Sequence, residues 1–520
     1  MIQRDFYSIL YAVESERQPE KNQPDCFPDL ALDKLFSSFT DLSGKIQPVF
    51  YTPLSDERNI RYRQDVLRDV ERYQQVFSSF ANTLNLIASQ MNGLRKALHE
   101  YGLLSYVEKG MLFNAAERYC GLVSFLHQAN DRNLYRSAGL CGFSEYLDSY
   151  VTSESYTVLQ REVTSLRLAF KEIRYCMLIK DGTIRVRKYE NQADLSEKII
   201  SLFDRFGHGK ARDYRQKPAE IPFAEHVENA VLHMVSQLYK ETFSRLESFC
   251  KQYMQFEDRV LLRFADDLRF YLFWIDITIP LKKAGLSFCY PEVSSLSGVI
   301  SASDTFDVVL AEKKGGNVVT NDFAIKKPER IIVITGPNRG GKTTFARLFA
   351  QIHWLASIGL TVPGTSACLK LFDTVYTHFG KPELASLENG KLQDDLLRLH
   401  AILGKATSRS IIILNEIFAS TVTDDAVKLG LLMMDKIAET GAAAVVVTFL
   451  DELALHGPET VSMMSTVDSS DNGRRTFKIC RKPPDGLAYA VQIAGQYGLT
   501  YSTLCRRLLN GDNGSSHVQE

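Results

Sequence analysis

The clearest chemical signal in the sequence is a glycine-rich segment at residues 331–348, IIVITGPNRGGKTTFARL. It contains the spacing G-x-x-x-x-G-K-T from Gly336 to Thr343. An apolar, β-branched run leads into this spacing and an amphipathic pattern follows it, so backbone N–H groups at a helix N-terminus can surround phosphate groups. The pattern predicts a phosphate loop at residues 336–344. The alternative is a glycine-rich turn without a ligand.

The side chains of this loop suit a nucleoside triphosphate. Lys342 can reach the β- and γ-phosphates as a point charge, and the hydroxyl of Thr343 can bind Mg²⁺. The glycines allow a tight turn and a close approach of the backbone. We therefore expect ATP and Mg²⁺ as cofactors. The loop residues expected to contact ATP are Gly336, Pro337, Asn338, Arg339, Gly340, Gly341, Lys342, Thr343 and Thr344.

A second candidate site follows at residues 408–417, SRSIIILNEI. This segment has the pattern of an apolar strand that ends at Asn415 and Glu416, where enzymes with a phosphate loop place their metal-binding and water-orienting residues. Glu416 is the catalytic candidate beside Lys342, because a carboxylate near the γ-phosphate can polarise the attacking water. The alternative is an ordinary glutamate at the end of a strand.

The elements that position these residues alternate between strands and helices from residue 287 onward. Apolar runs at IIVITG, TVYTHFG, SIIILNE, AAAVVVTF and RTFKICRK alternate with helical segments. This alternation predicts an α/β domain with a largely parallel, buried sheet at residues 287–510. A helical segment is expected at residues 499–509, and a disordered tail at 511–520.

Residues 51–286 have a different pattern, with long amphipathic runs such as 66–87 and 227–273 that predict long helices. Residues 174–190 interrupt them with β-type composition around Asp181 and Gly182, which predicts a hairpin at the tip of a helical arm. Residues 1–50 are expected to form a small cap or docking segment. Together these patterns predict a small N-terminal cap, a helical domain and an α/β domain.

Basic side chains gather after the predicted hairpin turn. Either a DNA-contacting patch or a solvated rim accounts for them, because acidic residues are interleaved. The candidate DNA contacts are Arg185, Arg187 and Lys188. The other basic residues of this stretch are Lys198, Arg205, Lys210, Arg212, Arg215 and Lys217.

Composition limits the class of protein. The 520 residues suggest two or three domains. A formal net charge of −1 excludes a globally basic coat that binds nucleic acid but not a local basic surface. Nine scattered cysteines lack metal-ligand spacing and favour reduced thiols over disulfides or structural zinc. With no secretory pattern and no apolar run of about 18 residues, we expect a cytoplasmic protein without membrane contact.

Several motifs resemble the MutS family in their order and spacing. TGPNRGGKTT at 335–344 resembles that family's T-G-P-N-M-G-G-K-S-T, and IGLTVPG at 358–364 resembles its I-G-x-x-V-P-A. FDTVYTHFG at 372–380 is similar to I-D-R-I-F-T-R-V-G, and NEIFASTVTDDA at 415–426 to D-E-I-G-R-G-T-S-x-x-D-G. VVVTFLDEL at 445–453 resembles F-A-T-H-Y-x-E-L. PLSDERNIRYRQDVL at 53–67 resembles the opening of the family's helical core.

The resemblance implies a P-loop NTPase domain of the ABC-type ATPase class, joined to a mainly helical core or lever domain at 51–286. It implies a reduced clamp near 170–220 and a homodimer. Residues 318–322, VVTND, stand where the family has a segment near the nucleotide base, which adds Val318 and Asn321 to the expected ATP contacts. The family's mismatch sensors carry two further domains in front, one with a mismatch-wedging Phe-x-Glu, and we expect no counterpart of these domains.

Three departures from the family pattern bear on the chemistry. Asn415 replaces an Asp, which removes a negative charge beside Mg²⁺ while an amide oxygen remains for indirect contact. Phe449 stands where the family has a His near the γ-phosphate. The family's ATP-contacting Ser of the partner subunit aligns with Leu392 or Gln393 within 388–399, so Lys391 or Gln393 is the expected substitute. Slow ATP turnover is the consequence we expect.

Two functions remain open at this point. The first is a dimeric, slowly hydrolysing ATPase that holds double-stranded or branched DNA as a nucleotide-gated clamp in repair or recombination, nucleoid-associated and without mismatch recognition by itself. The second is a nucleotide-controlled module that assembles proteins without DNA. A transporter ATPase is disfavoured, because the sequence has no L-S-G-G-Q segment and has a helical arm in front.

Overall fold

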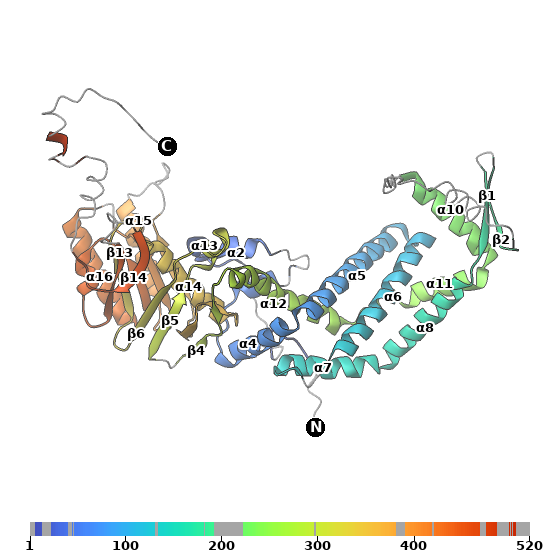
Figure 1. The fold of residues 1–520 in the computed structure, drawn as a ribbon, viewed down its shortest axis with the longest axis horizontal. Coiled ribbons are helices and arrows are strands. Elements are labelled where there is room, and N and C mark those ends of the chain that lie inside the picture. The colour runs from blue at the N-terminus through green and yellow to red at the C-terminus, as the bar shows by residue number, and fades with distance from the viewer. Residues whose placement is uncertain are drawn as a thin grey trace, which may run out of the picture. The chain divides into compact units, whose positions relative to one another are not determined.

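The computed structural model describes residues 6–12, 22–39, 44, 46–130, 134–180, 183–191, 222–295, 298–380, 391–418, 421–467, 475–485, 499, 501 and 503–505. The chain forms two compact units (Figure 1). Unit 1 comprises Met1–Ser8 and Tyr73–Leu268, and unit 2 comprises Ile9–Arg72 and Arg269–Glu520. The expected domain boundaries at residues 50 and 286 do not coincide with the limits of these units.

Unit 1 is built mainly of helices. Its helices are α5 (Gln74–Tyr101), α6 (Tyr106–Ala129), α7 (Ala138–Val151), α8 (Glu154–Lys171), α10 (Pro222–Leu238), α11 (Lys240–Gln252) and the first part of α12 (Arg259–Lys283). Helix α6 begins with a capping box, in which the Ser105 side chain accepts a hydrogen bond from the backbone of Glu108 and the Glu108 side chain from that of Ser105. The two amphipathic runs are therefore helical, but neither is a single helix, since 66–87 falls on two helices and 227–273 on three.

The predicted hairpin is present in unit 1. Strands β1 (Tyr175–Lys180) and β2 (Thr183–Lys188) pair in antiparallel fashion, with Lys180 opposite Thr183. The predicted turn residues Asp181 and Gly182 lie outside the described residues, as do the basic residues from Lys198 to Lys217. Helix α10 packs against β2.

Unit 2 contains a six-stranded, mostly parallel sheet, so the prediction of an α/β domain is confirmed. Its strand order is β10 (Val375–Phe379), β11 (Ile411–Asn415), β12 (Ala443–Val447), β7 (Ile331–Thr335), β13 (Thr460–Val467) and β14 (Arg475–Arg481). The three strands β11, β12 and β7 are buried along their whole length, which explains their uninterrupted apolar sequences. Only β14 runs antiparallel to its neighbour β13.

Helices cover the sheet on both faces. Alternate residues of β7, β11 and β12 form one core with α15 (Lys391–Lys405) and α16 (Thr423–Thr440). Because successive side chains of a strand point to opposite faces, the remaining residues of these strands face the other side, where α14 (Lys342–Ser357) contacts β11 and β12. The loop between β7 and α14 therefore lies at the carboxyl edge of the parallel strands.

A smaller sheet in unit 2 has no counterpart in the sequence-based prediction. It consists of β4 (Glu292–Ser294), β9 (Ser366–Lys370), β5 (Val299–Thr305) and β6 (Asn321–Lys326), in that order. A two-stranded pairing joins β3 (Phe288–Cys289) to β8 (Val362–Pro363). Along the four strands of the smaller sheet, buried residues alternate with less buried ones, so their sequences lack the continuous apolar runs that marked the larger sheet.

The N-terminal segments of unit 2 pack on α14, which explains why residues 9–72 belong to this unit. They form α1 (Phe27–Leu30), α2 (Leu32–Ser37), α3 (Gln47–Tyr51) and α4 (Glu57–Arg72). The ring of Phe27 meets Trp354 edge to face at 5.0 Å, and Trp354 Nε1 donates to the backbone oxygen of Phe50 at 2.9 Å. The buried guanidinium of Arg63 donates to the carbonyls of Leu10 and Ile358.

None of the helices in the part of the chain that the structure describes is both long enough and apolar enough to cross a membrane.

Acid should destabilise unit 2 through His353 in α14. Burial lowers the pKa of His353 to about 4 from 6.5, although its Nδ1–H donates to the carbonyl of Phe349. Between these pH values the unfolded chain binds more protons than the folded one, so the free energy of unfolding should fall by up to about 1.4 kcal/mol per pH unit as pH drops from 6.5 to 4. Urea unfolding followed by tryptophan fluorescence reports on this unit, because both tryptophans, Trp274 and Trp354, belong to it.

The matched variant is His353→Gln, which keeps an N–H donor but does not titrate. Its unfolding free energy should depend less steeply on pH in the same window. Equal slopes for the wild type and the variant would contradict the assignment to His353.

Candidate phosphate-binding site

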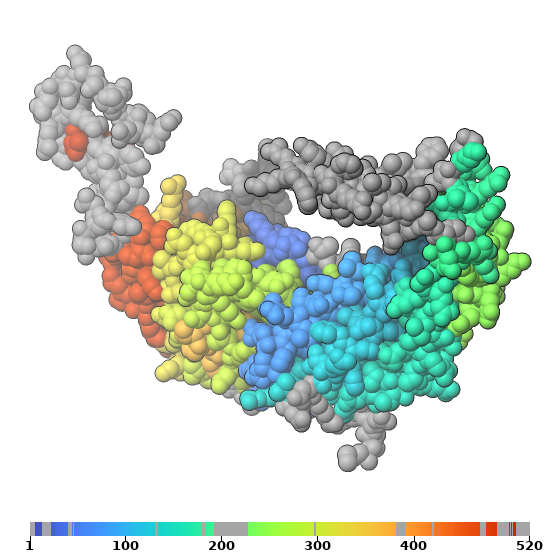
Figure 2. All heavy atoms as spheres, turned by 45° about the vertical axis from the view of Figure 1, so that its right-hand side comes forward, coloured from blue at the N-terminus to red at the C-terminus, as the bar shows by residue number. Residues whose placement is uncertain are grey.

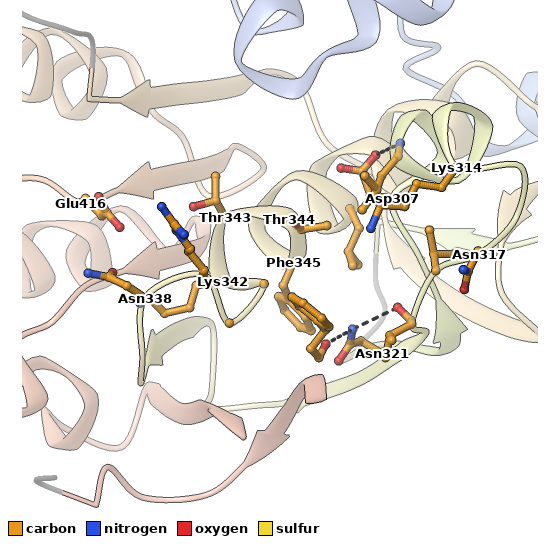
Figure 3. Close-up of a pocket in the computed structure, with 18 residues that line it drawn as sticks. Asp307, Lys314, Asn317, Asn321, Asn338, Lys342, Thr343, Thr344, Phe345 and Glu416 are labelled. Carbon is orange, nitrogen blue, oxygen red and sulfur yellow. Dashed lines mark hydrogen bonds between the residues drawn. The ribbon is translucent and has the colours of Figure 1, made fainter. Parts of the chain in front are cut away.

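A cavity of about 560 Å³ opens beside the phosphate loop in unit 2 (Figure 3). Its volume lies within the range of about 300–1,000 Å³ that is usual for small-molecule sites. The predicted site residues that line it are Val318, Asn321, Asn338, Arg339, Gly340, Gly341, Lys342, Thr343, Thr344 and Glu416. Gly336, Pro337 and Asn415 accept hydrogen bonds from side chains of this lining.

The loop owes its course to glycines and to strand β7. Gly341 is the N-cap of α14 with a φ of 93°, and Gly336 has a φ of 106°. A Cβ on Gly336 would lie 2.9 Å from the backbone oxygen of Ser465, so a larger residue would force the strands apart. The N–H groups at the start of α14 therefore face the cavity, where an anion is stabilised by hydrogen bonds and by the helix dipole.

Lys342 lies at the centre of the site and is 4% exposed. Its Nζ donates to the carbonyl oxygens of Gly336 at 2.8 Å and Pro337 at 3.1 Å, and it stands 4.3 Å from the ring centroid of Phe449. Burial lowers the pKa of Lys342 to about 8, while the carboxylate of Glu416 opposes this shift. The ammonium group thus has little water around it, which strengthens its attraction for a negatively charged ligand.

The two predicted motifs meet through one hydrogen bond. Thr343 Oγ1 donates to Asn415 Oδ1 at 2.9 Å, which joins the start of α14 to the end of β11. Glu416 follows Asn415 with a φ of 56° and lines the cavity. Oxygen atoms of this kind are the ligands that Mg²⁺ prefers, and a carboxylate beside them can accept a proton or orient water.

Asn321 lines the cavity but its amide is already engaged. Its Oδ1 accepts from the backbone N–H of Ile479 at 2.7 Å, and its Nδ2 donates to the backbone oxygen of Phe477 at 3.2 Å. Asn321 therefore ties β6 to β14 and holds Phe477, whose φ is 58°, with its half-exposed ring against the cavity. In Figure 3, Asn321 lies on the opposite side of the cavity from Glu416 and Asn338.

Sequence reasoning missed several residues of the lining. They are Asp307, Leu310, Lys314, Asn317, Val319, Phe345, Leu348 and Phe477. Asp307 caps α13 (Val308–Lys313) by accepting from the N–H of Leu310, and burial raises its pKa. Asp307 could have been found from the sequence, because an Asp directly before an apolar run is a typical N-cap. Phe477 could not, because its neighbours are defined only by the fold.

The candidate DNA contacts lie in the other unit, on β2. Arg185 and Arg187 are exposed and, by strand alternation, share one face of the hairpin. The Nζ of Lys188 stands 5.2 Å from the ring centroid of Tyr239. None of the three makes an ion pair among the described residues.

The segment expected to reach a partner subunit is described only from residue 391 onward, within α15. Leu392 is partly buried and packs against the core of unit 2. Gln393 is exposed. Two residues further on, Asp395 accepts from buried His378 at 2.8 Å and so fixes α15 to β10.

Together the fold and the site place a glycine-rich loop, of a kind that suits an anion, at the carboxyl edge of a mostly parallel α/β sheet. Residues 332–500 match the family model for MutS domain V. Over this region the chain is similar to members of the MutS family.

Relatives named "DNA mismatch repair protein MutS" share this region. The protein from Thermotoga petrophila is 25% identical over 276 residues, which cover 52% of this chain and 33% of the relative. The protein from Lactobacillus delbrueckii subsp. bulgaricus is 30% identical over 226 residues, or 42% of this chain and 26% of the relative. That from Desulfovibrio desulfuricans is 31% identical over 220 residues, or 41% and 24%. The chain thus spans about a third or less of these relatives.

Proposed function

We propose that the protein binds and slowly hydrolyses ATP with Mg²⁺ at the cavity beside the phosphate loop. The observation that carries this proposal is the convergence of Lys342, Thr343 and Glu416 on one cavity, at the N-terminus of α14. A P-loop NTPase of the ABC-type ATPase class fits this arrangement, because phosphoryl transfer needs positioning and charge stabilisation more than covalent chemistry.

Each residue has a role in this proposal. Backbone N–H groups of the phosphate loop bind the phosphates, and Lys342 exchanges its two carbonyl partners for phosphate oxygens. Thr343 would hold Mg²⁺ directly, and Asn415 would hold it indirectly through its hydrogen bond with Thr343. The ion would supply positive charge to the transferring phosphoryl group. Glu416 orients the attacking water and accepts its proton. On the far side of the cavity, the ring of Phe477 supports the nucleotide base.

Slow turnover follows from two residues beside the phosphates. The exposed ring of Phe449 faces the Lys342 ammonium, where it offers no hydrogen bond to the attacking water. Asn415 contributes an amide oxygen in place of a charged carboxylate. A single-turnover assay that finds ATP bound but never hydrolysed would refute the enzymatic half of the proposal.

We further propose a homodimer that acts on DNA in the cytoplasm as a nucleotide-gated clamp, with unit 1 as the DNA-contacting arm. The relatives' name, DNA mismatch repair protein MutS, supports a role near DNA repair. The exposed cations on β2 supply charge complementary to phosphate. Sedimentation with and without ATP tests the dimer, and a monomer under both conditions would exclude it.

Neutralising the hairpin should weaken DNA binding without sequence preference. The triple variant Arg185→Gln, Arg187→Gln, Lys188→Gln should lower affinity for duplex DNA and reduce the slope of log K against log salt concentration by about 1 for each phosphate that the hairpin no longer neutralises. The measurement is a binding isotherm over a salt series, with and without a non-hydrolysable ATP analogue. The control neutralises Lys96, Arg161 and Lys251, which lie elsewhere on the surface of the same unit.

An unchanged slope in the hairpin variant would remove β2 from the DNA-binding surface. The second candidate function is a nucleotide-controlled module that assembles proteins through the same unit. The exposed apolar side chains of Met177 and Leu178 on β1 favour it. A wild-type protein that binds no DNA at low salt would support this second function.

A further inference from the structure

The strands β13 and β14 contact the phosphate loop at positions that no motif marks. A Cβ on Gly340 would lie 1.9 Å from Oγ of Ser465, so the Ser465 hydroxyl fills the space that a side chain at Gly340 would need. Arg475 Nε donates to the carbonyl of Asn338 at 3.1 Å. The first contact comes from β13 and the second from the adjacent strand β14, and both reach the loop between Asn338 and Gly340. The loop therefore rests on this pair of strands.

The hydroxyl of Ser465 is unusual because, in the part of the chain that the structure describes, it is buried without a hydrogen bond. Ser465 is fully buried, and its Oγ has no hydrogen-bond partner among the described residues. The pairing of β13 with β14 also shifts in register between Ser465 and Val467. A buried polar atom without a partner costs free energy and calls for an explanation, one of which is a partner that the atom gains when a ligand binds.

We propose that Ser465 is a positioning residue of the phosphate loop. Its hydroxyl gains a hydrogen bond to the backbone of Gly340 when the loop adjusts to the phosphates of a bound nucleotide. A small movement suffices, because the hydroxyl already lies against Gly340. The bond would hold the loop in its phosphate-binding form, so part of the affinity for nucleotide comes from a residue that does not touch it. This inference rests on the proposed binding of ATP.

The test compares Ser465→Ala with Ser462→Ala. Ser462 lies on the same strand, but its Oγ already donates to the carbonyl of Lys482 at 2.8 Å. Thermal unfolding of the full chain is followed by tryptophan fluorescence with and without Mg-ATP, and the Kd for Mg-ATP is measured by titration. In Ser465→Ala we expect an unchanged or higher unfolding temperature without nucleotide, because the unpaired oxygen is gone. With nucleotide we expect the Kd to rise about 5- to 10-fold, the loss of one hydrogen bond.

A merely structural serine would behave in the opposite way. Ser462→Ala should unfold at a lower temperature without nucleotide and keep the wild-type Kd. If Ser465→Ala follows that pattern, or if its Kd is within twofold of the wild-type value, the proposal is wrong. If the wild type itself shows no Mg-ATP binding, the proposed function fails, and the role of Ser465 in nucleotide binding fails with it.

Discussion

Replacing Lys342 with methionine is expected to weaken Mg-ATP binding by about 100-fold. The ammonium group is buried at the cavity and its lowered pKa reflects the loss of water around it. Two charge-assisted hydrogen bonds to phosphate oxygens, together worth about 3 kcal/mol, correspond to this factor. Methionine keeps most of the apolar stem but lacks the ammonium group that lies 4.3 Å from the centroid of the Phe449 ring, so the substitution removes the charge with little change in side-chain volume.

Titration of Mg-ATP binding provides the measurement, and Lys436→Met is the control. Lys436 belongs to the same unit but is exposed, with Glu439 as its partner. Its removal should leave the Kd unchanged. A Kd for Lys342→Met within threefold of the wild-type value would mean that the cavity does not bind phosphates through this lysine, and would remove the main support for the proposed function.

Replacing Glu416 with glutamine is expected to lower the rate of ATP hydrolysis by at least about 100-fold while Mg-ATP stays bound. The amide has the same shape as the carboxylate and can still contact water, but it cannot accept a proton. The ring of Phe449, beside Lys342, has no polar atom and cannot accept the proton instead of Glu416. We therefore expect the proton-accepting step to depend on a single side chain.

A single-turnover assay with Mg-ATP measures this rate directly, and Glu439→Gln is the matched control on an exposed helix surface. The control should hydrolyse ATP at the wild-type rate. Equal rates for Glu416→Gln and the wild type would exclude Glu416 as the proton acceptor. Loss of binding together with hydrolysis would instead make Glu416 part of the nucleotide-binding framework.

The sequence by itself identified the parts of this protein that are continuous in the chain. The phosphate loop, the strand before it and the helix after it were readable because a turn of this kind needs glycines at fixed spacing. Strands β7, β11 and β12 were readable because they are buried on both faces and so are apolar throughout. Glu416 was readable because it directly follows one of these strands.

Only the tertiary structure decided which distant segments meet. Residues 9–72 belong with the α/β unit because Phe27, Arg63 and their neighbours pack on α14, a contact between positions some 300 residues apart. Nothing in the local pattern of those residues specifies such a partner.

The same limit applies within the site. The family resemblance of residues 318–322 predicts Asn321 as an ATP contact, and the fold engages its amide with the backbone of β14. Phe477 and Ser465 contact the phosphate loop because β13 pairs with β7 and β14 pairs with β13, an order of strands that sequence periodicity cannot reveal. Local chemistry thus follows from spacing along the chain, whereas the surroundings of each group follow from long-range packing.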